Sequence, residues 1–192
     1  MATSSTEICN LALRQLREQP IASLTEDSEP ARICNEFYDQ ARDYLMAKHP
    51  NNFAMTRQQL SQNATAPTFQ YLYSYALPTD PYCLRAYKLW HNGAWRDDWI
   101  IEGRNLLTDF DVDCYLLYIA RVTDVGSYSA TFVDAFAAYL AWKLAYPLTR
   151  SNPREEAAGR IFKEKWMEHR MADGGEGFQE EPEDGVFVSI RN

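Results

Sequence analysis

The sequence predicts an α+β protein that is mainly helical, with an antiparallel bundle of about four helices, a small antiparallel β portion inserted into it and an extended C-terminal arm. Three observations predict this class. Apolar residues recur at steps of three and four up to residue 49 and again from residue 129, whereas a period of two replaces this spacing over residues 69–77. Glycines and acids replace both patterns after residue 172. We therefore expect one domain over residues 1–173 and an arm over residues 174–192.

The first two helices are predicted over residues 5–17 and 28–48. Ser4 and Glu7 have the spacing of a capping box, in which each side chain satisfies a free amide at the start of the helix. Ser28 is a suitable N-cap for the second helix, whose apolar residues fall on one face and whose charged residues fall on the other. Both helices should therefore bury one side in a bundle.

The β portion is predicted over residues 52–124, between the second and third helices. Aromatic residues occupy every second position from 69 to 75, and the pattern of residues 69–77 is typical of a strand with one aromatic face. Further strands are expected at residues 84–89 and 114–122, and a hairpin at residues 99–107. These short segments indicate a small antiparallel sheet.

The last two helices are predicted over residues 129–149 and 153–172. The third helix is apolar almost all the way round, and Asp134 and Lys143 are its charged residues. Such a helix belongs in the middle of a bundle or at a contact between subunits. The fourth helix is amphipathic, with an apolar stripe that ends at Trp166.

The C-terminal arm differs in composition from the rest of the chain. Residues 173–192 hold six acids and one base, so they carry five of the eight surplus negative charges. They are too polar to fold on their own, yet they end in a strand-like apolar segment that suits addition to the sheet edge of another protein. The residues expected to make this contact are Phe178, Val186, Phe187, Val188, Ile190 and Arg191.

Composition excludes several classes of protein. The chain has 192 residues, of which 46% are hydrophobic, so bulk disorder is excluded. Its formal charge of -8 argues against a protein that grips DNA through the phosphates, because that affinity comes from Lys and Arg. Neither a secretory signal nor an apolar run of membrane-spanning length is visible, so we expect a protein made in the cytoplasm. Aromatic residues are abundant, at 14%.

No residue pattern predicts a metal, a cofactor or a catalytic centre. Cys9, Cys34, Cys83 and Cys114 are far apart and form no CxxC pair, which predicts free, partly buried thiols. The three histidines lack the spacing of metal ligands. Residues 109–113 begin like a calcium loop, but Cys114 stands where that loop requires glycine.

Two groups of side chains remain as candidates for function. Glu102 with Asp97 or Asp98 could serve a glycosidase, which needs two carboxylates about 5 to 10 Å apart. Twenty-seven acids produce such pairs by chance, however. A group of tryptophans in the β portion could stack sugars or bases, but packing or contact with another subunit is the favoured interpretation. Its members are Trp90, Trp95 and Trp99.

Several short segments follow one another in a distinctive order. They are residues 7–13 (EICNLAL), 21–28 (IASLTEDS), 49–54 (HPNNFA), 75–80 (YALPTD), 106–109 (LLTD), 118–124 (YIARVTD) and 132–148. In this order and spacing they resemble the tail tubular protein A family of bacteriophage head-to-tail connectors, over about residues 5 to 152. Members of that family often carry tryptophan where this chain has Asn51 or Asn52.

The resemblance implies an adaptor without catalysis or cofactor, a helical bundle with an inserted β portion that assembles as a ring of about twelve copies beneath the portal of a capsid. It implies a place in the neck of the virion. The C-terminal arm would grip the portal protein, and the β portion would face the tail, at a nozzle or tail-terminator protein. DNA would pass through the lumen without sequence-specific binding, and no membrane would be involved. Acids would suit that lumen because they repel phosphates.

Two other interpretations stay open. A connector with peptidoglycan-degrading, muramidase-like activity is the first, and Glu102 would be its first candidate acid. A bacterial protein-interaction module of the same fold is the second. A muramidase would be recognised by clearing of purified peptidoglycan, and an interaction module by its genome neighbours.

Overall fold

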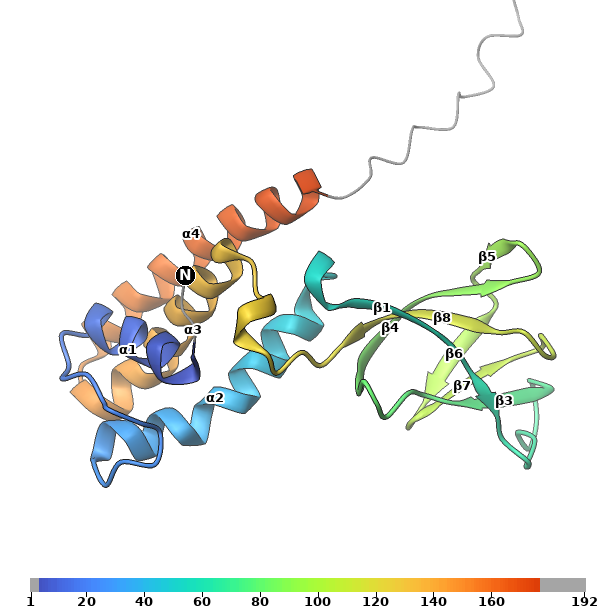
Figure 1. Cartoon of the computed structure of the whole chain (residues 1–192), viewed down its shortest axis with the longest axis horizontal. Coiled ribbons are helices and arrows are strands. Elements are labelled where there is room, and N and C mark those ends of the chain that lie inside the picture. Colours follow the sequence, from blue (N-terminus) through green and yellow to red (C-terminus); the bar gives the residue numbers. More distant parts are fainter. Residues whose placement is uncertain (1–3, 177–192) are drawn as a thin grey trace, which may run out of the picture.

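The computed structural model describes residues 4–176 as an elongated molecule with helices at one end and sheets at the other (Figure 1). Helices make up 47% of it and strands 23%. The expectation of a mainly helical protein with a small β insertion is therefore wrong. Two four-stranded antiparallel sheets form a second half with its own core, so the fold is a mixed α+β fold.

Within residues 4–176, the helical half consists of α1 (Ser5–Gln15), α2 (Glu29–Lys48), α3 (Ala130–Thr149) and α4 (Asn152–Glu176). Ser4, Ser28 and Ser129 cap the first three helices, each accepting a hydrogen bond from a backbone amide of the first turn. α3 contacts the other three helices and is buried on nearly every side. Its apolar composition follows from this central position.

The last helix runs further than predicted. α4 continues through Glu176 instead of ending near residue 172, although Gly174 and Gly175 both weaken a helix. Asp173 explains the difference, because its buried carboxylate accepts a hydrogen bond from the backbone amide of Asn52 at 3.1 Å. This tertiary contact holds the last turn of α4. Most of the predicted arm, residues 177–192, lies outside the described residues.

The β half lies between α2 and α3 and contains two antiparallel sheets, ordered β1-β8-β4-β5 and β2-β3-β7-β6 within residues 4–176. Short 3₁₀ turns, η1 (Asn52–Ala54) and η2 (Val125–Ser127), connect it to the helices. The strands of the first sheet are β1 (Met55–Gln59), β4 (Cys83–His91), β5 (Ala94–Arg96) and β8 (Tyr115–Ala120). Those of the second are β2 (Ser61–Gln62), β3 (Tyr73–Ala76), β6 (Trp99–Glu102) and β7 (Asn105–Thr108).

Two local features of the β half differ from the sequence prediction. The aromatic run at residues 69–77 forms only the four-residue strand β3, and Phe69 stands 79% exposed before it. Asn92 and Gly93, in contrast, form a tight turn with φ angles of 48° and 78°. Positive φ at both central residues is the requirement of a type I′ turn, which joins two strands in a two-residue hairpin, so β4 turns back into β5 here.

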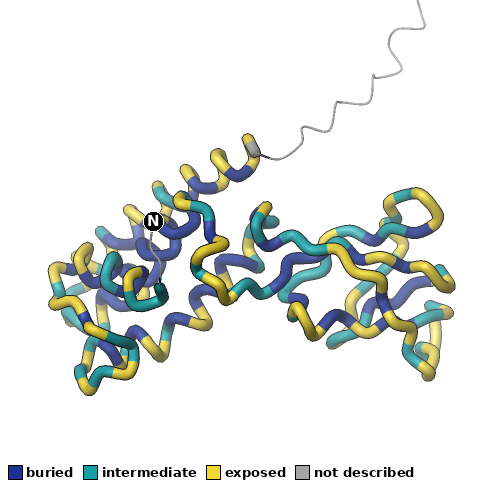
Figure 2. Tube along the Cα trace, in the orientation of Figure 1, coloured by how far each residue is buried: buried dark blue, intermediate teal, exposed yellow. Residues whose placement is uncertain are grey.

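Each half has its own core, and Figure 2 shows buried segments in both halves. Phe136 belongs to the helical core, and Leu89 belongs to the core between the sheets. The halves meet at Ile119, which lies on β8 but is buried in the helical core. An ion pair of 2.6 Å between Arg121 and Asp43 adds a second connection. The two halves are therefore joined by packing as well as by the chain.

Candidate interaction sites

The three predicted tryptophans of the β half do not form one cluster. Trp90 and Trp95 face each other across the β4–β5 hairpin, with ring centroids 5.0 Å apart and an edge-to-face geometry. Trp99 lies in the other sheet, where it packs against the core between the sheets. Its Nε1 donates to the backbone carbonyl of Arg96 at 2.9 Å. The structure thus brings two of the three residues together.

Trp90 and Trp95 line a hollow of about 380 Å³ on the outer side of the β1-β8-β4-β5 sheet, which we call the tryptophan face. Arg57, Tyr115, Leu116 and Leu117 complete its lining. Trp95 and Tyr115 are 42% and 41% exposed. Cross-strand pairing explains the arrangement, since Tyr115 lies opposite Trp90, and Trp90 lies opposite Trp95. An exposed apolar surface of this kind makes the tryptophan face a candidate contact site for another protein.

A second hollow, of about 660 Å³, lies between α2, α3 and α4, and we call it the helical groove. Its aromatic lining includes Trp142 and Phe162, whose rings stack with centroids 5.7 Å apart, and Trp166, 6.2 Å from Phe162. Met167 and Met171 also line it and are 61% and 70% exposed. Methionine and aromatic side chains adapt to a bound segment, so the groove is a second candidate contact site.

The helical groove is also locally positive. Lys48, Lys163 and Arg170 line it, and its described lining includes no acid. The Nζ atom of Lys48 lies 5.9 Å from the ring centroid of Phe162 and 5.7 Å from that of Trp166, within cation–π range. This groove therefore contrasts with the chain as a whole, whose formal charge is -8, and it favours an acidic partner.

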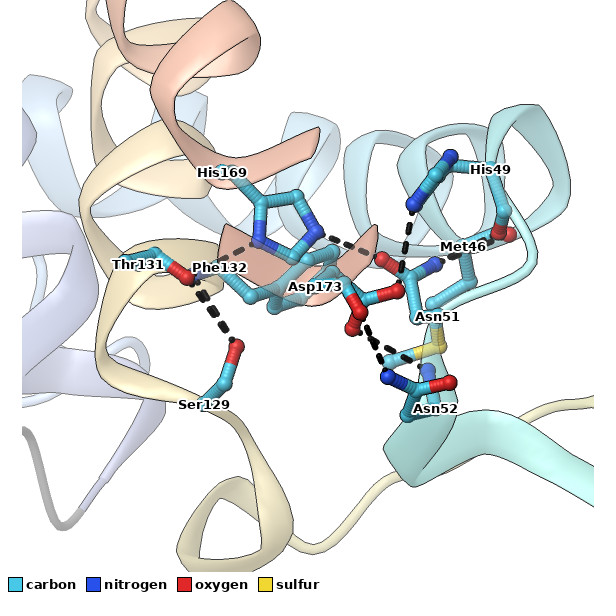
Figure 3. A network of polar contacts seen from close by, with 9 residues as sticks. All are labelled: Met46, His49, Asn51, Asn52, Ser129, Thr131, Phe132, His169 and Asp173. Carbon is cyan, nitrogen blue, oxygen red and sulfur yellow. Dashed lines mark hydrogen bonds and ion pairs between the residues drawn. The ribbon is translucent and has the colours of Figure 1, made fainter. Parts of the chain in front are cut away.

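A buried polar network lies where α4 meets the first residues of the β half (Figure 3). His169 is fully buried; its Nε2 donates to Oδ1 of Asn51 at 2.7 Å, and its Nδ1 accepts from the hydroxyl of Thr131 at 3.0 Å. The amide nitrogen of Asn51 donates to the carbonyl oxygens of Met46 and His49, which leaves its Oδ1 as an acceptor. This network therefore requires the neutral imidazole with its proton on Nε2.

Asp173 extends the network to the end of α4 (Figure 3). Its carboxylate accepts from the backbone amide of Asn52 and from Nε2 of His49, both at 3.1 Å. The side-chain amide of Asn52 donates to the backbone carbonyl of Asp173 at 2.7 Å. This role was not predicted, because Asp173 was considered only as one of the six acids of residues 173–192. The i,i+4 spacing of His169 and Asp173 puts both on one face of α4, but it does not point to their partners Asn51 and Asn52.

Burial controls the titration of both histidines in the network. It lowers the pKa of His169 to about 4, against a smaller opposing effect of the Asp173 carboxylate. Burial also lowers the pKa of His49, although Asp173 partly offsets this shift. Both imidazoles are therefore neutral at physiological pH, which matches the hydrogen bonds that they make. Their role is to hold the helices and the β half together.

The predicted acid pair does not have the geometry of a glycosidase centre. Glu102 is exposed at the β6–β7 turn, and Asp97 and Asp98 are exposed before the start of β6. Asp98 and Glu102 stand at opposite ends of β6, ~13 Å apart at the rise of an extended strand. A glycosidase needs a buried acid within about 10 Å of its partner, so this arrangement gives the muramidase interpretation no support.

The cysteines and His91 are buried and packed within the protein. All four cysteines are free, as predicted, but they are fully buried and not partly buried. Burial raises the pKa of Cys83 to about 11, so this thiol stays protonated. His91 is buried and stacks on Phe110 with ring centroids 4.9 Å apart. Among residues 4–176 no group of three or more His, Cys, Asp and Glu side chains is placed to hold a metal ion.

Comparison with known proteins gives no family assignment. The chain matches no protein-family model and no curated protein. No helix among residues 4–176 is long and apolar enough to cross a membrane. The predicted contact residues of the arm lie outside the described residues; they are Phe178, Val186, Phe187, Val188, Ile190 and Arg191.

Proposed function

We propose that this chain is a structural adaptor of a bacteriophage neck, a ring-forming head-to-tail connector without catalysis that joins the portal protein to the tail. The observation that carries the proposal is the presence of an uncovered aromatic surface on each half, the helical groove and the tryptophan face. An adaptor binds several proteins at once, so it needs separate contact surfaces on separate cores. The collinear resemblance of residues 5–152 to connector proteins indicates which partners these surfaces would bind.

The proposed ring of about twelve copies requires two different surfaces on each copy, because a head-to-tail contact between copies is heterologous. Aromatic residues are enriched in such contacts. The partly exposed Trp95 and Tyr115 on the β half fit a contact with a neighbouring copy or with a nozzle or tail-terminator protein. The β half would then face the tail, and the C-terminal arm would face the portal.

A connector also has to keep its two ends in a fixed relative orientation. The Arg121–Asp43 ion pair and the buried Ile119 join the sheets to the helices. His169 and Asp173 join α4 to the residues that enter β1. These contacts support a rigid joint through which one partner positions the other.

The acidic balance supports a lumen through which DNA passes. A formal charge of -8 disfavours tight binding of phosphates. If part of this charge faces the lumen, it repels the genome and lets it slide during ejection. We place the ring in the virion neck, with no sequence-specific contact to DNA.

The test is co-assembly with purified portal rings. The full chain should form a complex that electron microscopy and sedimentation detect, and a chain that ends at Glu176 should not, because it lacks the arm. The truncated chain retains the described fold, so its circular dichroism should match that of the described elements. A truncation at residue 176 is a cleaner test than one at Asp173, whose side chain holds the junction.

Phe69→Ser in the full chain is the matched control, because this exposed side chain lies outside both candidate surfaces. It should co-assemble like the unmodified chain. Undiminished co-assembly of the truncated chain would rule out the arm as the portal contact. A particle image that located this chain away from the neck would rule out the adaptor role itself.

A further inference from the structure

We propose that the helical groove is the resting site of the chain's own C-terminal segment, residues 177–192, until that segment meets its partner. Three observations carry the inference: the chemistry of the groove, the composition of the segment, and the place where the described chain ends. The inference rests on the proposed function only for the identity of that partner.

The groove and the segment are complementary in both charge and polarity. The groove offers the bases Lys48, Lys163 and Arg170 around an aromatic floor. Within residues 4–176, Lys163 and Arg170 form no ion pair with a carboxylate. The segment supplies acids and apolar side chains in alternating groups, which are Phe178, then Glu180, Glu181, Glu183 and Asp184, then Val186, Phe187, Val188 and Ile190.

The segment leaves the described chain beside the groove. α4 ends at Glu176, and Met171, which lines the groove, precedes that end by five residues, ~8 Å along the helix axis. The groove extends along α4 back to Phe162, a further ~14 Å. Sixteen residues span up to ~50 Å when extended, so a chain that reverses after Glu176 covers the whole groove.

Tethering makes a weak contact sufficient. A segment joined to its site by a short linker has an effective concentration on the order of millimolar, so an intrinsic Kd in that range already fills the groove for half of the time. The tryptophan face has one base, Arg57, but its strands β1, β4, β5 and β8 lie in the β half, whereas α4 belongs to the helical half (Figure 1). The groove is therefore the nearer complementary surface.

Such a contact has two consequences for assembly. It covers Met167 and Met171, which would otherwise expose apolar surface to other molecules. It also couples the groove to the arm: when the arm binds the portal protein, the groove becomes free for a neighbouring copy. Ring formation then follows portal binding and does not precede it in solution.

Methionine methyl NMR on the full chain tests the resting contact, because the chain has five methionines and two of them line the groove. Chemical shifts of the ¹³C-labelled ε-methyl groups are compared between the full chain and a chain that ends at Glu176. Truncation should shift the signals of Met167 and Met171. The signal of Met46, buried in the helical core, should stay unchanged.

Charge reversal locates the contact. The double substitution Lys163→Glu and Arg170→Glu is made in both the full and the truncated chain. The methyl signals of Met167 and Met171 should then have the same chemical shifts in the two proteins, because the segment no longer occupies the groove. The control pair Arg32→Glu and Arg154→Glu changes the net charge equally at exposed residues outside the groove, and it should leave the difference between full and truncated chains intact. A synthetic peptide of residues 177–192 should bind the truncated chain about tenfold more weakly after reversal in the groove.

Identical methyl spectra for the full and truncated chains would overturn the proposal. So would an unchanged difference between them after charge reversal in the groove. Shifts that grow with protein concentration would show that the segment of a second copy fills the groove, which also overturns the intramolecular contact. Co-assembly with portal rings is measured in a separate experiment. A negative NMR result would therefore disprove the resting contact without disproving the adaptor role, and the two proposals can fail independently.

Discussion

In the helical half a few long elements supply the core, whereas in the β half the core is assembled from strands of two to nine residues. α3 alone contributes eleven buried residues, but β2 and β5 contribute none. A long helix that is buried along its whole length gives a regular sequence pattern, and its contribution to stability is concentrated in a few large side chains. In short strands the sequence pattern is broken into pieces, and the contribution to stability is divided among many cross-strand pairs.

The largest expected effect is in the helical core. Phe136→Ala removes a fully buried ring that lies 5.1 Å from Tyr38 and 5.9 Å from Phe132. We expect the free energy of unfolding to fall by about 3 to 5 kcal/mol, because the packed helices cannot close the cavity. Urea denaturation followed by circular dichroism at 222 nm measures this. A loss below about 1 kcal/mol would mean that α3 is not the centre of the bundle.

Acid should weaken the junction between the halves. The pKa of His169 is about 4 in the folded chain, against 6.5 for the free group, so the unfolded chain binds a proton that the folded chain excludes. The free energy of unfolding should therefore fall as the pH drops from 6.5 towards 4, by roughly 3 kcal/mol at most. His49 acts in the same direction because its pKa is also lowered.

Denaturation midpoints of the unmodified chain and of His169→Gln, measured across this pH range, isolate the effect. Glutamine can still donate to Asn51 but does not titrate, so the variant should lose the part of the pH dependence that belongs to His169. Equal slopes for both proteins would contradict the assignment of the neutral imidazole.

Removal of Asn51 tests the same junction at neutral pH. Asn51→Ala deletes two donated hydrogen bonds and leaves the Nε2 proton of His169 without its acceptor. We expect a loss of about 2 kcal/mol in the free energy of unfolding. Asn52→Ala is the matched control, since this exposed residue gives up one hydrogen bond and should cost about 1 kcal/mol or less. Equal effects would show that burial of the network is unimportant.

The smallest effect on stability is expected at the tryptophan face. Trp95 is 42% exposed and lies on the edge strand β5, so Trp95→Ser should change the free energy of unfolding by about 1 kcal/mol or less. In the proposed ring it should nevertheless weaken contact with a neighbouring copy or the tail protein, while portal binding persists. Sedimentation of ring assemblies measures the contact. A large loss of stability would instead identify Trp95 as a core residue.

The helices were the part of the fold that the sequence could predict. Serine caps at Ser4 and Ser28, together with apolar spacings of three and four, place helices close to where the structure has them. The end of α4 could not be predicted locally. The contact of Asp173 with Asn52 joins residues 121 positions apart, and no nearby pattern encodes it.

The β half was underestimated because its strands are too short for alternation to be visible. A two-residue strand such as β2 has no period, and β3 is preceded by Gln70 with a φ of 72°, which breaks the aromatic run. One signal was present and unused: Asn92-Gly93 is a strong marker of a two-residue hairpin. The candidate tryptophans were separated for a related reason, because Trp95 and Trp99 are near in sequence but lie in different sheets.

The bond between Asp173 and Asn52 also determines how the molecule would carry mechanical tension. A pull on the C-terminal segment reaches the described chain at the last turn of α4, and that turn is fastened to both η1 and the end of α2. The force would therefore pass to the start of the β half as well as to α3, against which α4 packs. In the proposed connector, such an anchor point would hold the arm in place while DNA passes through the ring.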